Sequence, residues 1–535
     1  MQPSIGSTEI SIAELEALLE QARQEPLRED GYQKLRNAVG TLGLVTELLE
    51  KQETTLAELR ELLCPASTEK TAKVLERAGI RNGEKKPKLE PERKKPVAGH
   101  GRNGAAAYNG ARHIHVPHES LHSGDPCPGG CGGKVYPQHD PGLRVRIYGQ
   151  APIAATVYEL ARLRCNLCGD VFTAAPPPEA EEKKYDATAA SMMAVLRYGN
   201  GFPWTRLDGL QHGLGIPLPA ATQCEILADT AIPLGPALEE LVRQAAQWEL
   251  VHNDDTSMRV LSLDRSDVSA ERTGVFTSGI VCVFQQRRIA LFFTGAKHAG
   301  ENLADVLRQR RLELPPPIQM CDALSRNMPK LPAPLQTVVA NCLAHGRRGF
   351  VKVIASFPEQ CRFVLETLGE VYKYDEQARV ARLTPEERLH FHRQNSKPVM
   401  DKLEAWLKAQ FVERLVEPNS GLGKAISYLQ NHWARLTLFL QTAGAPLDNN
   451  LAERSLKKAI LHRKNSLFYK TRNGARMGDL YMSLIHTCEL NGANPFDYLT
   501  ELQRHAEQVK QAPAEWMPWN YRDRLAPVVA GIDSG

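Results

Sequence analysis

The chain lacks a long uninterrupted apolar segment. No run approaches the roughly 20 apolar residues that a membrane-spanning helix requires. The first residues also lack the basic segment and apolar core of a secretory signal peptide. We therefore expect a cytoplasmic protein that does not contact a membrane.

A strong charge imbalance and a disulfide pattern are also missing. The formal net charge is only +4 in 535 residues, so total charge indicates little about partners, although basic residues concentrate in particular segments. Eleven cysteines in so long a chain do not indicate a disulfide scaffold. Four of them have the spacing of a metal site, and we expect the others to be reduced.

The N-terminal region has leucine at every seventh position. The series is Leu35, Leu42, Leu49, Leu56 and Leu63. This heptad pattern predicts a coiled coil that associates with a second copy. Gly40 and Gly43 weaken the pattern, each by about 1 kcal/mol relative to alanine. An amphipathic helix that packs on its own domain is the alternative.

A basic, proline-containing segment follows at 69–118. Runs such as 85–88 and 93–96 predict a linker that is flexible until it meets a polyanion. A solvated tether and a DNA phosphate contact both fit this composition. Further along, 218–226 resembles a turn that enters a second helix. It fits a DNA-binding helix-turn-helix or a helical pair packed on the next domain.

Two close cysteine pairs lie some thirty residues apart, with glycines beside each pair. They are Cys127, Cys131, Cys165 and Cys168. Such pairs supply a tetrahedral four-cysteine Zn²⁺ site, and the glycines allow tight turns around the metal. Alternating runs at 143–148 and 155–160 predict strands between the pairs. Because four thiolates leave no ligand position open, we expect the zinc to be structural.

Three acids occupy chemically suggestive positions. Asp254 and Asp322 each end an apolar run, and Glu453 lies near the start of a helical stretch. Each has a structural alternative, because an aspartate at a strand end is often a turn former and an early helical glutamate complements the helix dipole. Together they can supply the oxygen ligands that Mg²⁺ prefers.

The pattern between the acids predicts that they meet. The runs 275–284 and 288–294 form a β-hairpin around 285–287, and a helix near 299–311 leads into the Asp322 strand. Three strands, a helix and a fourth strand match the opening of a ribonuclease-H-like fold. The first and fourth strands are adjacent in that fold, so Asp254 and Asp322 become neighbours. The long stretch before Glu453 predicts a helical insertion.

The helix that carries Glu453 is followed by many cations. Asn449 and Lys457 lie four residues on either side of Glu453 and share its helix face. We expect DNA contacts from this region. A second basic cluster near 345–348 fits either contact with DNA phosphate or a surface helix with ordinary charges. The candidate DNA-contact residues are His345, Arg347, Arg348, Asn449, Asn450, Lys457, Arg463, Lys464, Lys470, Arg472 and Arg476.

These motifs resemble those of transposases of the insertion-sequence-66 (IS 66) family over nearly the whole chain. The most specific block runs from 448–465 and extends through 490–495, and 253–256 and 344–348 also match. The resemblance implies a DDE transposase with Asp254, Asp322 and Glu453 as metal ligands. Family members usually have Asp-Glu-Thr at 254–256 and Asp-Gly-Tyr at 322–324, where this chain has Asp-Asp-Thr and Asp-Ala-Leu.

The expected architecture is a multidomain α+β protein. Its segments are a helical or coiled-coil oligomerisation segment at 1–66, a basic linker at 67–120, a Cys₄ zinc ribbon at 121–178, a helical region at 179–247, the first part of a ribonuclease-H-like α/β catalytic domain at 248–355, a helical insertion at 356–445, the end of the catalytic domain at 446–510 and a C-terminal tail at 511–535.

The expected activity is two-metal DNA transposition by cleavage at the element ends and transfer of the 3′-hydroxyl to target DNA. The expected cofactors are two Mg²⁺ ions, replaceable by Mn²⁺, and structural Zn²⁺. The expected partners are double-stranded DNA, a second copy or higher homo-oligomer, and accessory proteins of the element, with a location at the bacterial nucleoid. A nuclease that cuts without joining and a non-catalytic transposase-derived DNA-binding protein remain alternatives.

Overall fold

The computed structural model describes most of the chain after residue 114. The described residues are 115–136, 144, 147, 151–178 without Cys165, Leu167 and Gly169, 184–262 and 274–525, with a few isolated earlier positions. Contacts divide the chain into residues 1–81 and 82–535. The predicted coiled coil and most of the basic linker lie outside the described residues. Within the described part, no helix is both long and apolar enough to cross a membrane.

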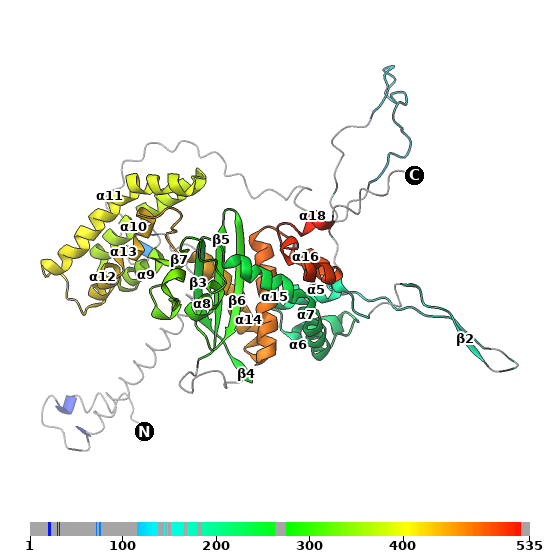
Figure 1. Cartoon of the computed structure of the whole chain (residues 1–535), viewed down its shortest axis with the longest axis horizontal. Coiled ribbons are helices and arrows are strands. Elements are labelled where there is room, and N and C mark those ends of the chain that lie inside the picture. The colour runs from blue at the N-terminus through cyan, green and yellow to red at the C-terminus, as the bar shows by residue number, and fades with distance from the viewer. Residues whose placement is uncertain are drawn as a thin grey trace. The chain divides into compact units, whose positions relative to one another are not determined.

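A five-stranded mixed sheet forms the centre of the second unit (Figure 1). In spatial order its strands are β6 (Arg287–Gly295), β5 (Phe276–Phe284), β3 (Leu250–Ser257), β7 (Ile318–Cys321) and β8 (Val338–Asn341). The strands β6, β5 and β3 are antiparallel neighbours, whereas β3, β7 and β8 run parallel. The prediction that the Asp254 strand lies beside the Asp322 strand is therefore confirmed.

The β5–β6 hairpin is tighter than the sequence predicted. Its turn contains only Gln285 and Gln286, and Arg287 already pairs with Phe284. Gln285 adopts a positive φ of 54°, which lets two residues reverse the chain. The strands are long because residues 280–282 and 289–292 are apolar and buried on the sheet.

Two helices cover opposite faces of this sheet. α8 (Ala299–Leu307) packs on β3 and β5, where Asn302 Nδ2 donates to Ser278 Oγ at 2.8 Å. α14 (Asn450–Ser466) packs on the same two strands from the other face. Its Leu456 approaches Gly279 so closely that a Cβ there would lie 2.9 Å from Leu456 Cδ2. Glycine at 279 therefore permits α14 to lie directly on the sheet.

α15 (Arg472–Leu490) runs along the edge strand β6 (Figure 1). Its side chains accept hydrogen bonds from β6 that a neighbouring strand would otherwise accept. The backbone N–H groups of alternate β6 residues donate to side chains on or just after this helix. The pairs are Arg288 to Asn491 Oδ1 at 3.1 Å, Ala290 to Thr487 Oγ1 at 3.1 Å, Phe292 to Ser483 Oγ at 3.0 Å and Thr294 to Asp479 Oδ2 at 2.7 Å. We call the four accepting residues the polar ladder, which consists of Asp479, Ser483, Thr487 and Asn491.

The helical region before the sheet shares one hydrophobic core with the C-terminal helices. It contains α5 (Ala187–Ala194), a π-helical turn η2 (Val195–Gly199), α6 (Trp204–Gly213) and α7 (Ala220–Ala245). Tyr481 OH on α15 donates to Leu227 O on α7 at 3.0 Å. Gln503 on α16 (Pro495–Arg504) donates to Ser191 Oγ on α5 at 2.9 Å. The segments expected at 179–247 and 446–510 thus pack as one body.

The expected C-terminal tail is wrong for its first part. α17 (Ala506–Gln511), the short turn η6 (Pro513–Glu515) and α18 (Tyr521–Leu525) continue the fold. Trp516, Met517 and Tyr521 are buried, and Tyr498 OH donates to Trp516 O at 2.8 Å. Large apolar side chains therefore anchor this segment.

Helices fill most of the interval between Asn341, the last residue of β8, and Asn450, the first residue of α14. They are α9 (Leu343–Val353), α10 (Pro358–Val380), α11 (Pro385–Val412), α12 (Gly421–Asn431) and α13 (Trp433–Leu436). Thr384 begins α11 with a capping box that involves Glu387. α12 ends before His432, after which α13 and the short turn η5 (Leu438–Leu440) follow.

The cysteine-rich segment contains one short hairpin. β1 (Arg162–Arg164) pairs antiparallel with β2 (Val171–Thr173), around the second cysteine pair. The strand expected at 155–160 is wrong, because these residues form no regular structure. Pairing starts only next to the turn that carries the cysteines, which sets the register. Most of the strand expected at 143–148 lies outside the described residues.

Candidate active site

Asp254 and Asp322 are brought together by the parallel pairing of β3 and β7. Asp254 lies on β3, and Asp322 directly follows the last residue of β7. Asn327, fully buried in the 3-10 turn η3 (Ser325–Asn327), donates through Nδ2 to both carboxylates. The distances are 2.5 Å to Asp322 Oδ1 and 3.4 Å to Asp254 Oδ1. The two aspartates therefore flank a single amide.

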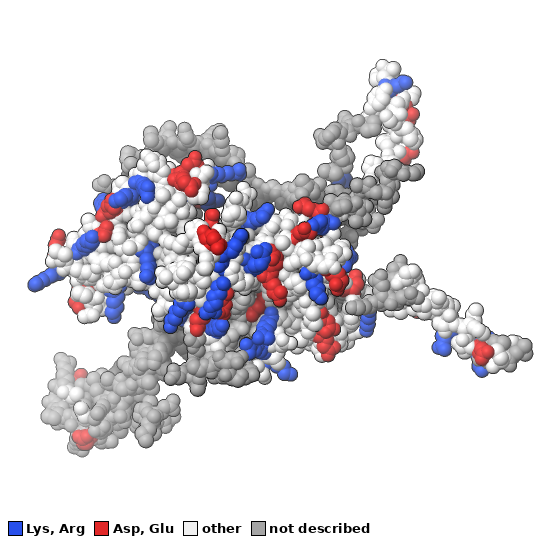
Figure 2. Space-filling model, viewed as in Figure 1, with Lys and Arg blue, Asp and Glu red and all other residues white. Residues whose placement is uncertain are grey.

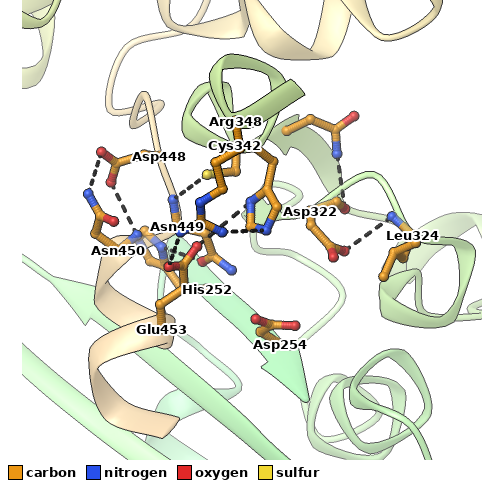
Figure 3. A network of polar contacts seen from close by, with 12 residues as sticks. His252, Asp254, Asp322, Leu324, Cys342, Arg348, Asp448, Asn449, Asn450 and Glu453 are labelled. Carbon is orange, nitrogen blue, oxygen red and sulfur yellow. Dashed lines mark hydrogen bonds and ion pairs between the residues drawn. The ribbon is translucent and has the colours of Figure 1, made fainter. Parts of the chain in front are cut away.

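Glu453 comes from the first turn of α14, which is fastened to β3. The fully buried Asn449 precedes this helix and donates through Nδ2 to Asn253 O at 3.1 Å. Its Oδ1 lies 3.1 Å from His252 Nδ1. Burial lowers the pKa of His252 to about 4, so this imidazole is neutral near pH 7. These contacts place Glu453 beside the Asp254 strand, and the three acids surround one region (Figure 3).

The carboxylate of Glu453 contacts two basic side chains of α9. Arg348 Nη2 donates to Glu453 Oε2 at 2.9 Å, and His345 Nδ1 lies 3.7 Å from Glu453 Oε1. Arg348 Nη1 is also 3.1 Å from His345 Nε2. Figure 3 shows Arg348 reaching Glu453 from the helix above it. The predicted basic cluster at 345–348 therefore lies at the acids.

The electrostatics of Asp254 fit a cation site. Burial raises the pKa of Asp254 most, the charge of Asp322 adds to this, and Asp255 and Glu453 contribute less, so that together they bring the pKa to about 7. Carboxylates that raise one another's pKa are stabilised in their charged form by a cation between them. The oxygen ligands of Asp254, Asp322 and Glu453 thus suit a hard divalent ion.

Asp255 points away from this region. Its side chain is only 1% exposed and contacts His298 Nδ1 at 2.8 Å and Arg326 Nη2 at 3.4 Å. It also accepts from Ala299 N at the start of α8 at 3.4 Å. Because neighbouring strand residues face opposite sides, Asp254 faces α14 and Asp255 faces α8.

The structure identifies site residues that the sequence did not single out. Asn327 was missed because its contacts depend on a turn that has no pattern in the sequence. His252 had a usable signal, since it lies two residues before Asp254 and shares its strand face. Cys342, buried at the end of β8, accepts a hydrogen bond at Sγ from Asn449 N at 3.2 Å.

Some predicted DNA-contact residues have structural roles instead. Asn449 is fully buried and uses its amide within the protein, so a DNA contact for it is wrong in this structure. Asn450 Nδ2 donates to Asp448 Oδ2 at 2.6 Å. Arg463 donates to Thr256 Oγ1 at 3.1 Å and to Ser257 Oγ at 2.6 Å, and so fastens the end of β3.

The remaining cations occupy several elements. α14 ends at Ser466, and the chain then forms β9 (Tyr469–Thr471), which pairs with β4 (Val260–Ser262), before α15 begins. The exposed candidates are Lys457, Lys464, Lys470 and Arg476, whereas Arg347 and Arg472 are half-buried. Basic side chains gather over the middle of the displayed face with acidic ones among them (Figure 2). They form a surface rather than a stripe on one helix.

The first cysteine pair has the geometry of a metal-binding turn. Gly130 and Gly132 have positive φ values of 67° and 78°, and Cys127 N donates to Gly133 O at 2.8 Å. Hydrogen bonds from the Gly133 backbone and the Cys127 side chain lower the pKa of the Cys131 thiol. Cys168 donates to Asp170 Oδ2 at 3.2 Å. Cys165 lies outside the described residues, so the four-cysteine zinc site stays a prediction.

Comparison with known proteins adds a family to this geometry. The model of the family described as "Transposase IS66 family" matches residues 183–477, which is more than half of the chain. The chain belongs to the IS66 transposase family. The matched region contains all three acids, η3 and the basic cluster of α9.

Curated relatives occur in Sinorhizobium fredii (strain NBRC 101917 / NGR234). The uncharacterized protein y4jD is 33% identical over 190 residues, which cover 34% of this chain and 36% of y4jD. The uncharacterized protein y4hP is 25% identical over 354 residues, which cover 62% of each. The chain therefore matches from about a third to three fifths of the length of these relatives.

Proposed function

We propose that this IS66 family member is a DNA transposase that cleaves the ends of its element and transfers the freed 3′-hydroxyl to target DNA. The observation that carries the proposal is the placement of Asp254, Asp322 and Glu453 around one region, within the part of the chain that matches the family. The sheet order and strand directions support a ribonuclease-H-like catalytic domain.

The three carboxylates would hold two Mg²⁺ ions, or Mn²⁺ in their place. Bound ions of this kind activate a water or hydroxyl nucleophile and stabilise the leaving oxygen of a phosphodiester. The chain's own contribution is to hold the ligands in place. The paired strands β3 and β7 fix the two aspartates, Asn327 sets their spacing, and Asn449 fixes the start of the Glu453 helix.

Arg348 gives the site a second feature that suits DNA. In this structure its guanidinium pairs with Glu453. If Glu453 held a metal ion, the positive charge of Arg348 would lie beside the site. A DNA phosphate would then neutralise it by a charge-assisted, bidentate contact.

The wider partners follow from the proposed reaction. Exposed Lys457, Lys464, Lys470 and Arg476 would contact duplex phosphates, with affinity that falls as salt rises. Joining two element ends calls for at least a dimer, for which residues 30–64 are the proposed association segment. Structural zinc at the four cysteines, accessory proteins of the element and a location at the bacterial nucleoid complete the proposal.

Amide variants of the three acids test the chemistry. Asp254→Asn, Asp322→Asn and Glu453→Gln each remove one charge with little change in shape, so strand cleavage should fall by several orders of magnitude while DNA binding is retained. The substrate is DNA flanking the encoding gene, with the ends located by footprinting. Asp255→Asn is the matched control and should keep measurable activity. Loss of cleavage in Asp255→Asn but not in Asp254→Asn would refute the assignment.

Two further assays separate the alternatives. Pre-cut element ends supplied with target DNA should be joined, whereas a nuclease that only cuts would leave them unjoined. A non-catalytic DNA-binding protein would bind the ends but show no Mg²⁺-dependent cleavage at any protein concentration.

A further inference from the structure

A second set of metal-ligating atoms includes Glu453 but neither of the two aspartates. Cys342 at the end of β8, His345 in the first turn of α9 and Glu453 each offer one ligand atom, and these atoms lie within 4.8 Å of one another. Among the residues that the structure describes, this is the one group of three or more such side chains so close together.

Backbone hydrogen bonds fix the places from which these three side chains extend. Cys342 N donates to Cys321 O at 2.9 Å, and Leu343 N donates to Leu447 O at 3.0 Å. The hydrogen bond from Asn449 N to Cys342 Sγ joins the same point to the start of α14. The turn into α9 places His345 three residues after Cys342. The cluster is therefore built by three elements that are fastened to one another.

The ligand types differ from those of the aspartate site. One sulfur, one imidazole nitrogen and one carboxylate oxygen suit a borderline cation such as Zn²⁺, whereas Mg²⁺ prefers oxygen alone. In tetrahedral zinc sites such atoms lie about 3.4–3.6 Å apart, given bonds of about 2.0–2.3 Å. A contraction of roughly 1 Å is therefore needed, within the reach of χ rotations of His345 and Glu453.

We propose that Cys342, His345 and Glu453 form a Zn²⁺-selective site that inhibits the enzyme by taking Glu453 away from the Mg²⁺ site. The inference rests on the proposed function in one respect, namely that Glu453 is a Mg²⁺ ligand. Its carboxylate is one of the three ligand atoms of the group with Cys342 and His345, and it also borders the region that Asp254 and Asp322 surround (Figure 3). The Glu453 carboxylate cannot serve as a ligand in both metal sites at once.

Binding requires two local changes. The Cys342 thiol loses its proton to solvent as the Zn–S bond forms, and the Asn449 N–H then donates to a thiolate. Arg348 must withdraw from Glu453, because its guanidinium would repel a cation at that position. A fourth ligand position stays open to water, as in zinc sites with three protein ligands.

Cobalt binding by the full-length protein tests the site directly. The protein is purified with zinc already in its cysteine ribbon and is then titrated with Co²⁺, whose thiolate complexes absorb in the near ultraviolet. We expect one further equivalent of thiolate-bound cobalt in the native chain. Cys342→Ser should lose this band, yet serine still accepts the hydrogen bond from Asn449 N. Cys224→Ser, half-buried on α7, is the matched control and should keep it.

Zinc inhibition of Mg²⁺-dependent cleavage provides the second measurement, with each variant normalised to its own zinc-free rate. Cys342→Ser should raise the half-inhibitory Zn²⁺ concentration by at least about tenfold, and His345→Ala should do the same.

Equal inhibition and equal cobalt spectra in Cys342→Ser and the native chain would overturn the inference. A native chain that cleaves DNA but binds no additional cobalt would overturn it and leave the proposed function standing. Additional cobalt binding that depends on Cys342, without cleavage under any condition, would uphold the metal site and overturn the proposed function.

Discussion

At the scale of single residues, Asp254 is a proposed metal ligand whose burial in ionised form lowers the stability of the fold. Its folded-state pKa of about 7 exceeds the ordinary value of 3.8, because burial and the Asp322 charge disfavour the ionised form. Between about pH 4 and pH 7, the carboxyl group of Asp254 is therefore protonated in the native state but ionised in the unfolded chain. Its contribution to stability is fully present below about pH 4 and is lost as the pH rises through about 7.

Asp254→Asn should therefore stabilise the protein at alkaline pH. Without added divalent cations, we expect the variant to exceed the native chain by on the order of 1 kcal/mol at pH 8 and to match it near pH 4, since solvent access to the site reduces the full effect. Thermal unfolding at both pH values measures this. Asp305→Asn, exposed on α8, is the control and should show no such pH-dependent gain. A less stable Asp254→Asn at pH 8 would contradict the prediction.

Asn327 is the positioning residue that the structure adds. Its amide separates Asp254 from Asp322, so Asn327→Ala should raise the Mg²⁺ concentration needed for half-maximal cleavage by roughly 10- to 100-fold. Cleavage rates across a Mg²⁺ series test this. Asn302→Ala removes another buried amide, on α8, and should leave the Mg²⁺ dependence unchanged. An unchanged Mg²⁺ dependence in Asn327→Ala would show that the amide only fills space.

The residues of the site were predictable to different degrees. Asp254 and Asp322 could be found because each ends an apolar run of the sequence, and the parallel pairing of β3 and β7 then places them together. Asn449 was placed near the site but given the wrong role, because a polar residue beside an acid gives no sign of its burial. The Arg348–Glu453 pair joins distant segments across a long insertion, and local spacing carries no information about such contacts.

At the scale of elements, the polar ladder holds α15 against β6. Buried N–H groups without a partner cost about 1–3 kcal/mol each. Thr487→Val keeps the shape of the side chain but leaves Ala290 N without its acceptor, so it should destabilise the protein by about that amount. Thr487→Ser keeps the hydroxyl and should cost less. Urea unfolding of the two variants measures the difference, and equal losses would mean that only packing matters at this position.

The elements themselves were largely visible in the sequence, whereas their partners were not. The runs at 275–284 and 288–294 predicted the β5–β6 hairpin, and the long stretch before Glu453 predicted helices such as α11. The polar ladder escaped detection because polar residues on a helix normally indicate solvent. The packing of residues 513–525 escaped for the opposite reason, since a few aromatic anchors give no periodic signal.

At the scale of the whole molecule, one hydrophobic core joins segments that the sequence separates widely. Residues of α5 and α7 pack with residues of α15 and α16, so the helices before the sheet and those after it stabilise each other. The family match begins at residue 183 and thus includes the first of these helices. Removal of either segment should expose the core of the other.

The cysteine-rich segment lies before that match and is expected to depend on metal. Cys165→Ser should remove one zinc ligand, loosen the module and weaken binding to the element ends by about tenfold or more, since structural zinc contributes directly to folding. Metal analysis should find one Zn²⁺ per native chain and less in the variant. Cys224→Ser is the control, because Cys224 lies on α7. Native protein purified without chelators that contains no zinc would rule out the site.

The hydrogen bonds of the polar ladder also limit where residues can be inserted into or removed from α15. Four helical residues advance about 6.0 Å, whereas two strand residues advance about 6.8 Å, so successive rungs drift apart by almost 1 Å. Over the three intervals from Asp479 to Asn491 the mismatch reaches roughly 2 Å, which is near the limit that side chains can absorb. Because the spacings of the helix and the strand differ, only about four successive pairs of residues can stay within hydrogen-bonding distance of each other. A one-residue insertion within α15 would turn every later rung by about 100° away from the strand. Changes of length in the IS66 fold should therefore collect in the loops around this helix and not within it.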